Sequence, residues 1–208
     1  MIDQIDRFER WREKLAPDTS YLVSKVCDEV LPLIIDAGYA RLHNYGGDKA
    51  LYAALGRCIA LQFQSGREWP TIEFRFTDLG RPTLVVDFAW LPEVCLRWEK
   101  TDWVQIPRPA AFVSEGYVFF RLMRNQRRSN DGMFGISRLW PHFRPRFAID
   151  REIDVLKGLL DWLLETLSRE MPEDWGSATM GRRVHVHALR QRGSIALNRR
   201  KKRRQNDQ

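Results

Sequence analysis

The stretch TIEFRFTDLGRPTLVVDFAW at residues 71–90 contains two runs rich in β-branched and aromatic residues, joined by DLGRP. Apolar residues recur at alternate positions in both runs, which is the period of a β-strand that buries one face. Aspartate, glycine and proline between the runs supply the chemistry of a turn. The stretch therefore predicts an antiparallel hairpin, and it sets the fold class.

Four more strands are predicted on either side of this hairpin, at 59–64, 93–98, 102–106 and 116–123. The links between successive strands are short, which is typical of an antiparallel meander. About five or six strands are expected in the sheet. A short helix capped by Asp48 is expected just before them, in GGDKALYAALGR at residues 46–57.

The first forty residues predict two amphipathic helices. Apolar residues at spacings of three and four run from Ile2 to Leu15, and a second such stripe runs from Leu22 to Ile34. Asp18 or Thr19 is expected to cap the second helix, and Gly38 to end it. Because proline removes a backbone donor, Pro32 is expected to kink or break this helix near residues 28–32.

A long amphipathic helix is predicted over residues 150–171, with Asp150 as its cap and Pro172 just after its end. Its apolar stripe is broad enough to cover one face of the sheet. The predicted class is therefore α+β, with N-terminal helices, an antiparallel sheet and a C-terminal helix packed on it. We expect one domain over residues 1–176 and a basic, largely disordered tail over residues 177–208.

The charge of the chain is concentrated at its C-terminus. The formal net charge is +7, yet residues 181–208 hold ten Lys or Arg and one acid. Residues 1–180 hold 24 basic and 26 acidic residues, so the body is slightly acidic. Such asymmetry is typical of an arm that binds nucleic acid or another acidic surface. A solvated tail without a partner is the other interpretation.

Two groups of basic residues are therefore candidate phosphate contacts. The first lies in the C-terminal segment and comprises Arg182, Arg183, Arg190, Arg192, Arg199, Arg200, Lys201, Lys202, Arg203 and Arg204. Within it, RKKRRQ (200–205) resembles the arginine-rich RNA-binding segment of the lentiviral transactivator Tat, over these six residues alone. The second group is internal and comprises Arg121, Arg124, Arg127, Arg128, Arg138, Arg144 and Arg146.

Aromatic residues alternate with the internal arginines, as in Phe134, Trp140, Phe143 and Phe147. Exposed aromatics next to arginines stack on unpaired bases and would favour single-stranded nucleic acid. Aromatics are more often buried, and we expect these to belong to the core.

The hairpin also holds a pair of carboxylates, and the two registers that keep its apolar faces together differ in their consequences. In one register Glu73 lies opposite Asp87, which could begin an Mg²⁺-dependent nuclease site. In the other Arg75 lies opposite Asp87 as a surface ion pair. Like charges directly opposite destabilise a sheet, so we expect the second register.

No other motif predicts catalysis or a cofactor. His185 and His187 have the spacing of metal ligands on one side of a strand, but zinc needs three or four ligands, so we expect no metal site. Cys27, Cys58 and Cys95 are odd in number and widely spaced, which indicates free thiols. Without a secretory leader or an apolar run of ~18 residues, the chain is expected in the cytoplasm.

These observations predict a nucleic-acid-binding accessory protein, RNA- or DNA-binding, without catalysis and without a cofactor. A cytosolic protein-interaction module, such as an immunity or regulatory subunit, is the alternative. The nuclease built on Glu73 and Asp87 is the third hypothesis.

Overall fold

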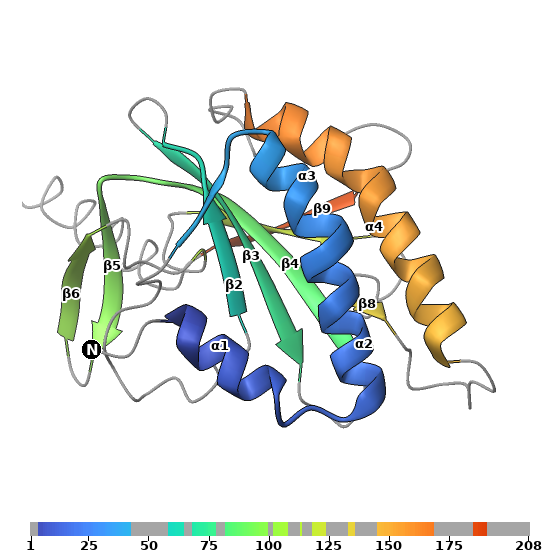
Figure 1. The fold of residues 1–208 in the computed structure, drawn as a ribbon. Coiled ribbons are helices and arrows are strands. Elements are labelled where there is room, and N and C mark those ends of the chain that lie inside the picture. Colours follow the sequence, from blue (N-terminus) through green and yellow to red (C-terminus); the bar gives the residue numbers. More distant parts are fainter. Residues whose placement is uncertain are drawn as a thin grey trace, which may run out of the picture.

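A computed structural model of the chain describes ten parts of it: residues 4–42, 58–64, 68–77, 82–99, 102–107, 113, 118–123, 133–135, 145–168 and 185–190. Helices and strands are segregated in the manner of an α+β fold, with the helices gathered on one side of a sheet (Figure 1). The predicted class, with N-terminal helices, an antiparallel sheet and a C-terminal helix, is confirmed.

Within the described residues, the main sheet is antiparallel and has seven strands. Its central path runs β1-β2-β3-β4-β7-β9, and β8 pairs with another part of β4. The strands are β1 (Ala40–Arg41), β2 (Cys58–Gln62), β3 (Trp69–Thr77), β4 (Thr83–Leu91), β7 (Val118–Met123), β8 (Met133–Gly135) and β9 (His185–Arg190). The hairpin at 71–90, formed by β3 and β4, is its longest pairing, with nine register pairs from Trp69–Leu91 to Thr77–Thr83.

The strands do not follow a simple meander. Strands β5 (Val94–Glu99) and β6 (Asp102–Pro107) pair with each other in a separate sheet, so β7 takes the place beside β4. Hydrophobic burial accounts for this departure from sequence order. Cys95 of β5 forms a small buried cluster with Val113 and with Ala89 and Leu91 of β4, on the side of β4 away from the helices.

The N-terminal helices are α1 (Gln4–Arg12), α2 (Pro17–Lys25) and α3 (Leu31–Asp36), with a π-helical turn at Val26–Val30 between the last two. The disruption predicted near residues 28–32 is confirmed. Pro32 has no backbone N–H, and just before it the N–H of Leu31 bonds to the carbonyl of Val26, five residues back. Helix α3 ends at Asp36, and Gly38 just beyond it has a φ of 92°, which is the stop signal that the sequence predicted.

Two predicted helix caps are wrong. Helix α2 begins with Pro17, and Ala16 occupies the cap position without a side-chain hydrogen bond. Proline suits a helix start because its φ is already helical and its missing donor is not needed there. The same reason explains α4, which spans Pro145–Leu167 and not residues 150–171. Asp150 lies inside α4 and accepts a hydrogen bond from the Tyr21 hydroxyl of α2 at 2.7 Å.

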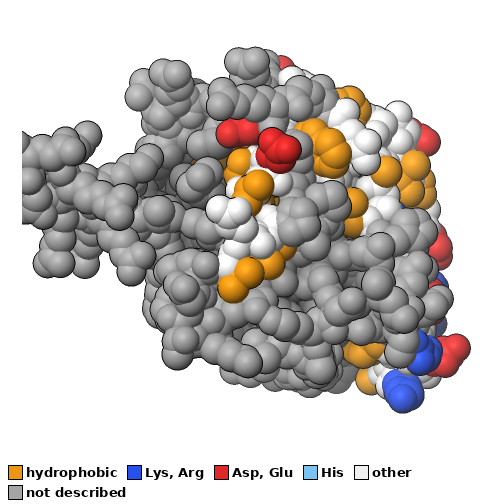
Figure 2. Space-filling view, turned by 90° about the vertical axis from the view of Figure 1, so that its left-hand side faces the viewer, with side chains coloured by type: hydrophobic (Ala, Val, Ile, Leu, Met, Phe, Trp, Pro, Cys, Tyr) orange, Lys and Arg blue, Asp and Glu red, His pale blue; other side chains and the backbone are white. Residues whose placement is uncertain are grey.

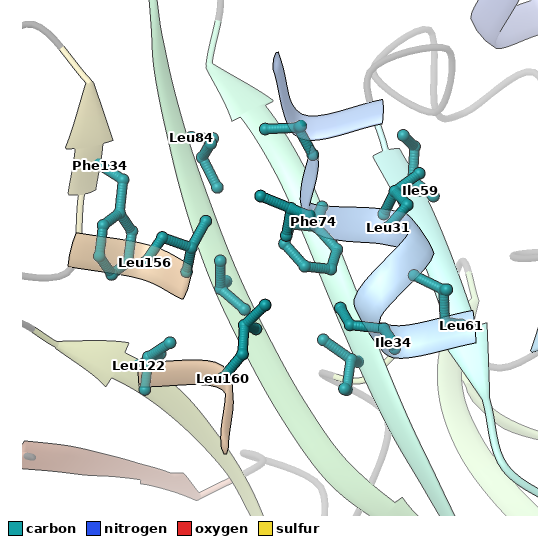
Figure 3. Close-up of a cluster of buried hydrophobic side chains, with 14 of the residues drawn as sticks. Leu31, Ile34, Ile59, Leu61, Phe74, Leu84, Leu122, Phe134, Leu156 and Leu160 are labelled. Atoms are coloured by element: carbon teal, nitrogen blue, oxygen red, sulfur yellow. The ribbon is translucent and has the colours of Figure 1, made fainter. Parts of the chain in front are cut away.

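The core lies between the helix layer and the face of the sheet that it covers. Leu31 and Ile34 of α3 and Leu156 and Leu160 of α4 meet Ile59, Leu61, Phe74, Leu84, Leu122 and Phe134 of the sheet (Figure 3). Full burial of such side chains stabilises the fold by about 1.5–3 kcal/mol each. Phe134 is completely buried, so this member of the internal aromatic series belongs to the core, as expected. For Phe147 the expectation is wrong, because its side chain is 68% exposed on α4.

Residues 185–190 lie within the segment that the sequence assigns to the tail, yet they form a strand. Strand β9 pairs with β7 in an antiparallel register from Val118–Arg190 to Met123–His185. The described sheet therefore includes six residues beyond the predicted domain edge at 176. Within the described ranges, no helix combines the length and the apolarity that crossing a membrane requires.

Candidate functional site

The sheet has two chemically different faces. Alternate residues of β3 and β4, such as Phe74 and Val86, point into the core beneath the helices. The residues between them, such as Glu73 and Asp87, belong to the opposite side, which we call the second face. Four charged side chains of the second face, Glu73, Arg75, Asp87 and Arg121, contact one another and are called the charge cluster.

The register of the hairpin places Glu73 directly opposite Asp87. The expected register, with Arg75 opposite Asp87, is wrong. Both registers keep the apolar faces together, and in the observed one Thr77 pairs with Thr83, so residues 78–82 connect the strands. The repulsion between the two carboxylates is offset by arginines on either side.

Arg75 of β3 lies beside both carboxylates. Its Nε donates to Oε1 of Glu73 at 2.9 Å, and its Nη2 contacts the same oxygen and Oδ2 of Asp87, the latter at 3.3 Å. Burial alone lowers the pKa of Arg75, but the nearby Glu73 and Asp87 carboxylates outweigh it and raise that pKa above its ordinary value. Arg75 is therefore a permanent cation and no base.

Arg121 of β7 holds Asp87 from the other side. Strand pairing places Arg121 directly opposite Asp87, and the guanidinium binds the carboxylate with both branches, Nε to Oδ1 at 2.7 Å and Nη2 to Oδ2 at 3.0 Å. This forked arrangement is the strong form of an ion pair. On the far side of β7, the register partner of Arg121 is residue 187 of β9.

Polar residues continue along β2 and β3. Gln62 Nε2 donates to the hydroxyl of Thr71 at 2.9 Å, and both residues are buried. Gln62 Oε1 has no hydrogen-bond partner within the described part of the chain. Cys58 lies opposite Arg75, and burial, together with Glu73, raises the pKa of its thiol, which disfavours the nucleophilic thiolate.

The metal-dependent hypothesis needs Glu73 and Asp87 as metal ligands. Both carboxylates already accept hydrogen bonds from guanidiniums, Glu73 from Arg75 and Asp87 from Arg121. In the residues that the structure describes, no three His, Cys, Asp or Glu side chains are grouped so that they could hold a metal ion. His185 and His187 occupy alternate positions of β9, but their side chains lie outside the described part. What the charge cluster offers chemically is a set of oriented guanidinium donors, suited to recognising an anion.

The predicted phosphate contacts are only partly within the described residues. Arg121 belongs to the charge cluster, Arg146 is exposed on α4 with its guanidinium 5.2 Å from the ring centre of Tyr21, and Arg190 ends β9. Arg121 and Arg146 are thus on opposite sides of the sheet. Outside the described residues lie Arg124, Arg127, Arg128, Arg138, Arg144, Arg182, Arg183, Arg192, Arg199, Arg200, Lys201, Lys202, Arg203 and Arg204.

Figure 2 views the molecule from the side that carries β5 and β6. In this view the described hydrophobic side chains lie near the centre with acidic ones above them, and the basic ones lie at the lower right beside further acidic side chains. Neither Trp140 nor Phe143 is among the described residues, nor are the predicted helix at 46–57 and its Asp48 cap.

Sequence reasoning missed Arg75 as a member of a shared site with Arg121. The signal was present, because charged residues alternate with the apolar residues of three separate strands, at 73, 75, 87 and 121. Charges inside otherwise apolar strands are costly unless they are paired, so they predict partners across the sheet. Comparison with protein-family models, with curated proteins and with solved structures finds no match for this chain.

Proposed function

We propose that this chain is a nucleic-acid-binding accessory protein that contacts phosphates through residues 191–208, which we call the basic arm. The observation that carries the proposal is the charge distribution. The basic arm holds seven basic residues and one acid, whereas residues 1–180 carry a small acidic excess. A local concentration of positive charge on an acidic body is suited to a polyanion.

The physical basis is release of counterions from the nucleic-acid backbone. Each phosphate that an arginine or lysine neutralises releases condensed cations, so affinity falls steeply with added salt and depends little on base sequence. If all six consecutive cations, Arg199 to Arg204, bind phosphates, the slope of log affinity against log salt is about −4 to −5. No proton transfer or bond cleavage is part of this function.

The position of β9 determines where the chain should be cut to test the basic arm. The basic arm follows directly on β9, which pairs with β7, and β7 carries Arg121. A truncation that also removes β9 would disturb the sheet, and its effect on binding would be ambiguous. The chain should therefore be cut after residue 196, or its six cations from Arg199 to Arg204 replaced by glutamine at full length.

The experiment measures binding of the full chain and these two variants to fluorescent single-stranded oligonucleotides, DNA and RNA, across a salt series. We expect both variants to lose most of the affinity and to show a salt slope smaller by about 4 to 5. Unchanged affinity in the full-length glutamine variant would overturn the proposal. Recovery of the wild-type chain with a stoichiometric protein and without nucleic acid would instead favour the protein-interaction module.

A further inference from the structure

We propose that Arg75 and Arg121 together bind a phosphate group on the second face of the sheet. The inference deepens the proposed function and rests on it for the identity of the partner, because it locates a phosphate contact on the folded body. Arg75 did not stand among the contacts that the sequence suggested, and the geometry of the charge cluster brings it to Arg121 through Asp87.

The two carboxylates of the charge cluster use only some of the N–H donors of its arginines. A guanidinium carries five N–H donors. The carboxylates take up Nε and Nη2 of Arg75, and Nε and Nη2 of Arg121. Nη1 of each arginine takes no part in these bonds to the carboxylates, and Arg75 also forms a hydrogen bond with the thiol of Cys58.

The carboxylates and the arginines of the charge cluster differ sharply in burial. The side chains of Glu73 and Asp87 are 1% exposed, whereas those of Arg75 and Arg121 are 39% and 30% exposed. The carboxylates are therefore positioning residues beneath the arginines, and the arginines form the surface that solvent reaches. Guanidiniums held in one orientation lose little conformational entropy when they bind a ligand.

The net charge and the donors of the charge cluster indicate the class of ligand. The cluster contains two carboxylates and two guanidiniums, so it has no net charge, and a simple electrostatic attraction to any anion is weak. The N–H groups that two fixed guanidiniums do not use on the carboxylates favour an anion with several acceptor oxygens, which is the geometry of phosphate. The phosphate could belong to a nucleic-acid backbone or to a small phosphorylated molecule, and these two sources are separated experimentally below.

The position of the pair relative to the basic arm favours the nucleic-acid source. Arg121 lies on β7, whose neighbour β9 immediately precedes the arm in the sequence. A strand of nucleic acid held by the arm would thus start from the edge of the sheet next to the cluster. The body and the arm would then contact different phosphates of one molecule, which increases affinity through the effective concentration of the second contact.

The test uses the full-length chain and the ¹⁵N NMR signals of the arginine Nε–Hε groups. Arg75→Lys and Arg121→Lys each remove one signal, which assigns it, and lysine retains the charge beside Asp87. Inorganic phosphate is then titrated into the wild-type chain, with sodium chloride at equal ionic strength as the reference. We expect saturable shifts of both assigned signals with phosphate alone. Shifts that match the chloride reference would overturn the proposal, without any variant having to fold.

Two further measurements tie the site to its ligand. We expect Arg121→Lys to weaken phosphate binding about tenfold or more, the loss of roughly one charge-assisted hydrogen bond, since a lysine that pairs with Asp87 has fewer N–H donors left than arginine. Arg151→Lys, at an exposed position of α4 on the other side of the sheet, is the matched control and should change nothing. Equal phosphate affinity in the Arg121→Lys and Arg151→Lys chains would contradict the assignment.

The source of the phosphate follows from the full-length chain with glutamine at 199–204. If residual oligonucleotide binding by this chain decreases further with Arg121→Lys, the ligand is nucleic acid. If phosphate shifts the two signals but oligonucleotide does not, the site is confirmed for a small phosphorylated molecule. Failure of the arm variant to lose affinity would count against the proposed function alone, because the phosphate titration does not involve the arm.

Discussion

Glu73 and Asp87 lie directly opposite each other on neighbouring strands, both buried, in a register that places two like charges side by side. Such a pair destabilises a sheet when it stands alone. Here Arg75 and Arg121 bind the two carboxylates from either side, so the four charges form a neutral unit. The stability of the hairpin should therefore depend on the complete set.

Replacing one charged residue of the charge cluster should lower the free energy of unfolding. Replacing its oppositely charged partner as well should lower it no further. Arg121→Met leaves the buried Asp87 with only the longer contact to Arg75, and we expect a loss of about 2–4 kcal/mol in the free energy of unfolding. The double variant Asp87→Val/Arg121→Met removes both charges and should be at least as stable as Arg121→Met. Urea unfolding of the four chains of this cycle measures the coupling. Additive losses would show that the two residues act independently.

Two glycines should respond in opposite ways to replacement by alanine. Gly135 has a φ of 111°, and an added Cβ would lie 2.2 Å from the carbonyl oxygen of Pro82, so we expect Gly135→Ala to cost about 2–4 kcal/mol. Gly158 lies within α4, and its Cβ would meet nothing within 4 Å. Gly158→Ala should therefore stabilise the chain by about 0.5–1 kcal/mol. Thermal unfolding of both variants checks the contrast, and an equal sign would contradict it.

The contact between the helices should make stability depend on pH in the acidic range. Glu29 accepts hydrogen bonds from Lys157 of α4, at 2.8 Å, and from Lys25, and these lower its pKa below the ordinary value of 4.5. A lowered pKa in the folded state adds stability above about pH 4.5, and this is lost as the pH falls through the folded value. At neutral pH, Glu29→Gln should cost at most about 1 kcal/mol.

The measurement is urea unfolding between pH 3 and pH 7 for wild type and Glu29→Gln. The difference between the two chains should shrink as the pH falls below about 4.5. Glu13→Gln, at an exposed position in the same half of the chain, is the control for general charge effects. A difference that is constant over this range would argue against the ion pairs with Lys157 and Lys25.

We expect removal of β9 to lower the stability of the fold, and removal of the residues after 196 to leave it unchanged. A chain that ends at residue 184 lacks β9 and its six register pairs with β7, which at ~0.2–1 kcal/mol each corresponds to a loss of roughly 1–6 kcal/mol. A chain that ends at residue 196 retains β9 and should unfold at the wild-type temperature. Thermal unfolding of the two truncated chains compares them. Identical melting temperatures would mean that β9 contributes nothing to the fold.

Several secondary-structure elements and the charge distribution of this protein follow from the sequence alone. The alternation in residues 71–90 was sufficient for the hairpin, and Pro32 for the irregular helix, because strand faces and a missing backbone donor are properties of the chain itself. The apolar stripe that follows Asp150 predicted a helix packed on the sheet, although Pro145 and not Asp150 marks the start of α4. The excess of positive charge after residue 180 is likewise a fact of composition.

Tertiary structure decided what depended on contacts between distant segments. Two hairpin registers keep the apolar faces together, and only pairing with β7 brings Arg121 to Asp87, 34 residues away. Cys95 of β5 is buried with Val113, and β5 and β6 pair with each other in a separate sheet. Strand β7 pairs with β4 on one side and with residues 185–190 on the other. The sequence thus determined the elements and the charge, while the choice of neighbours, which depends on burial across the sheet, determined the candidate site.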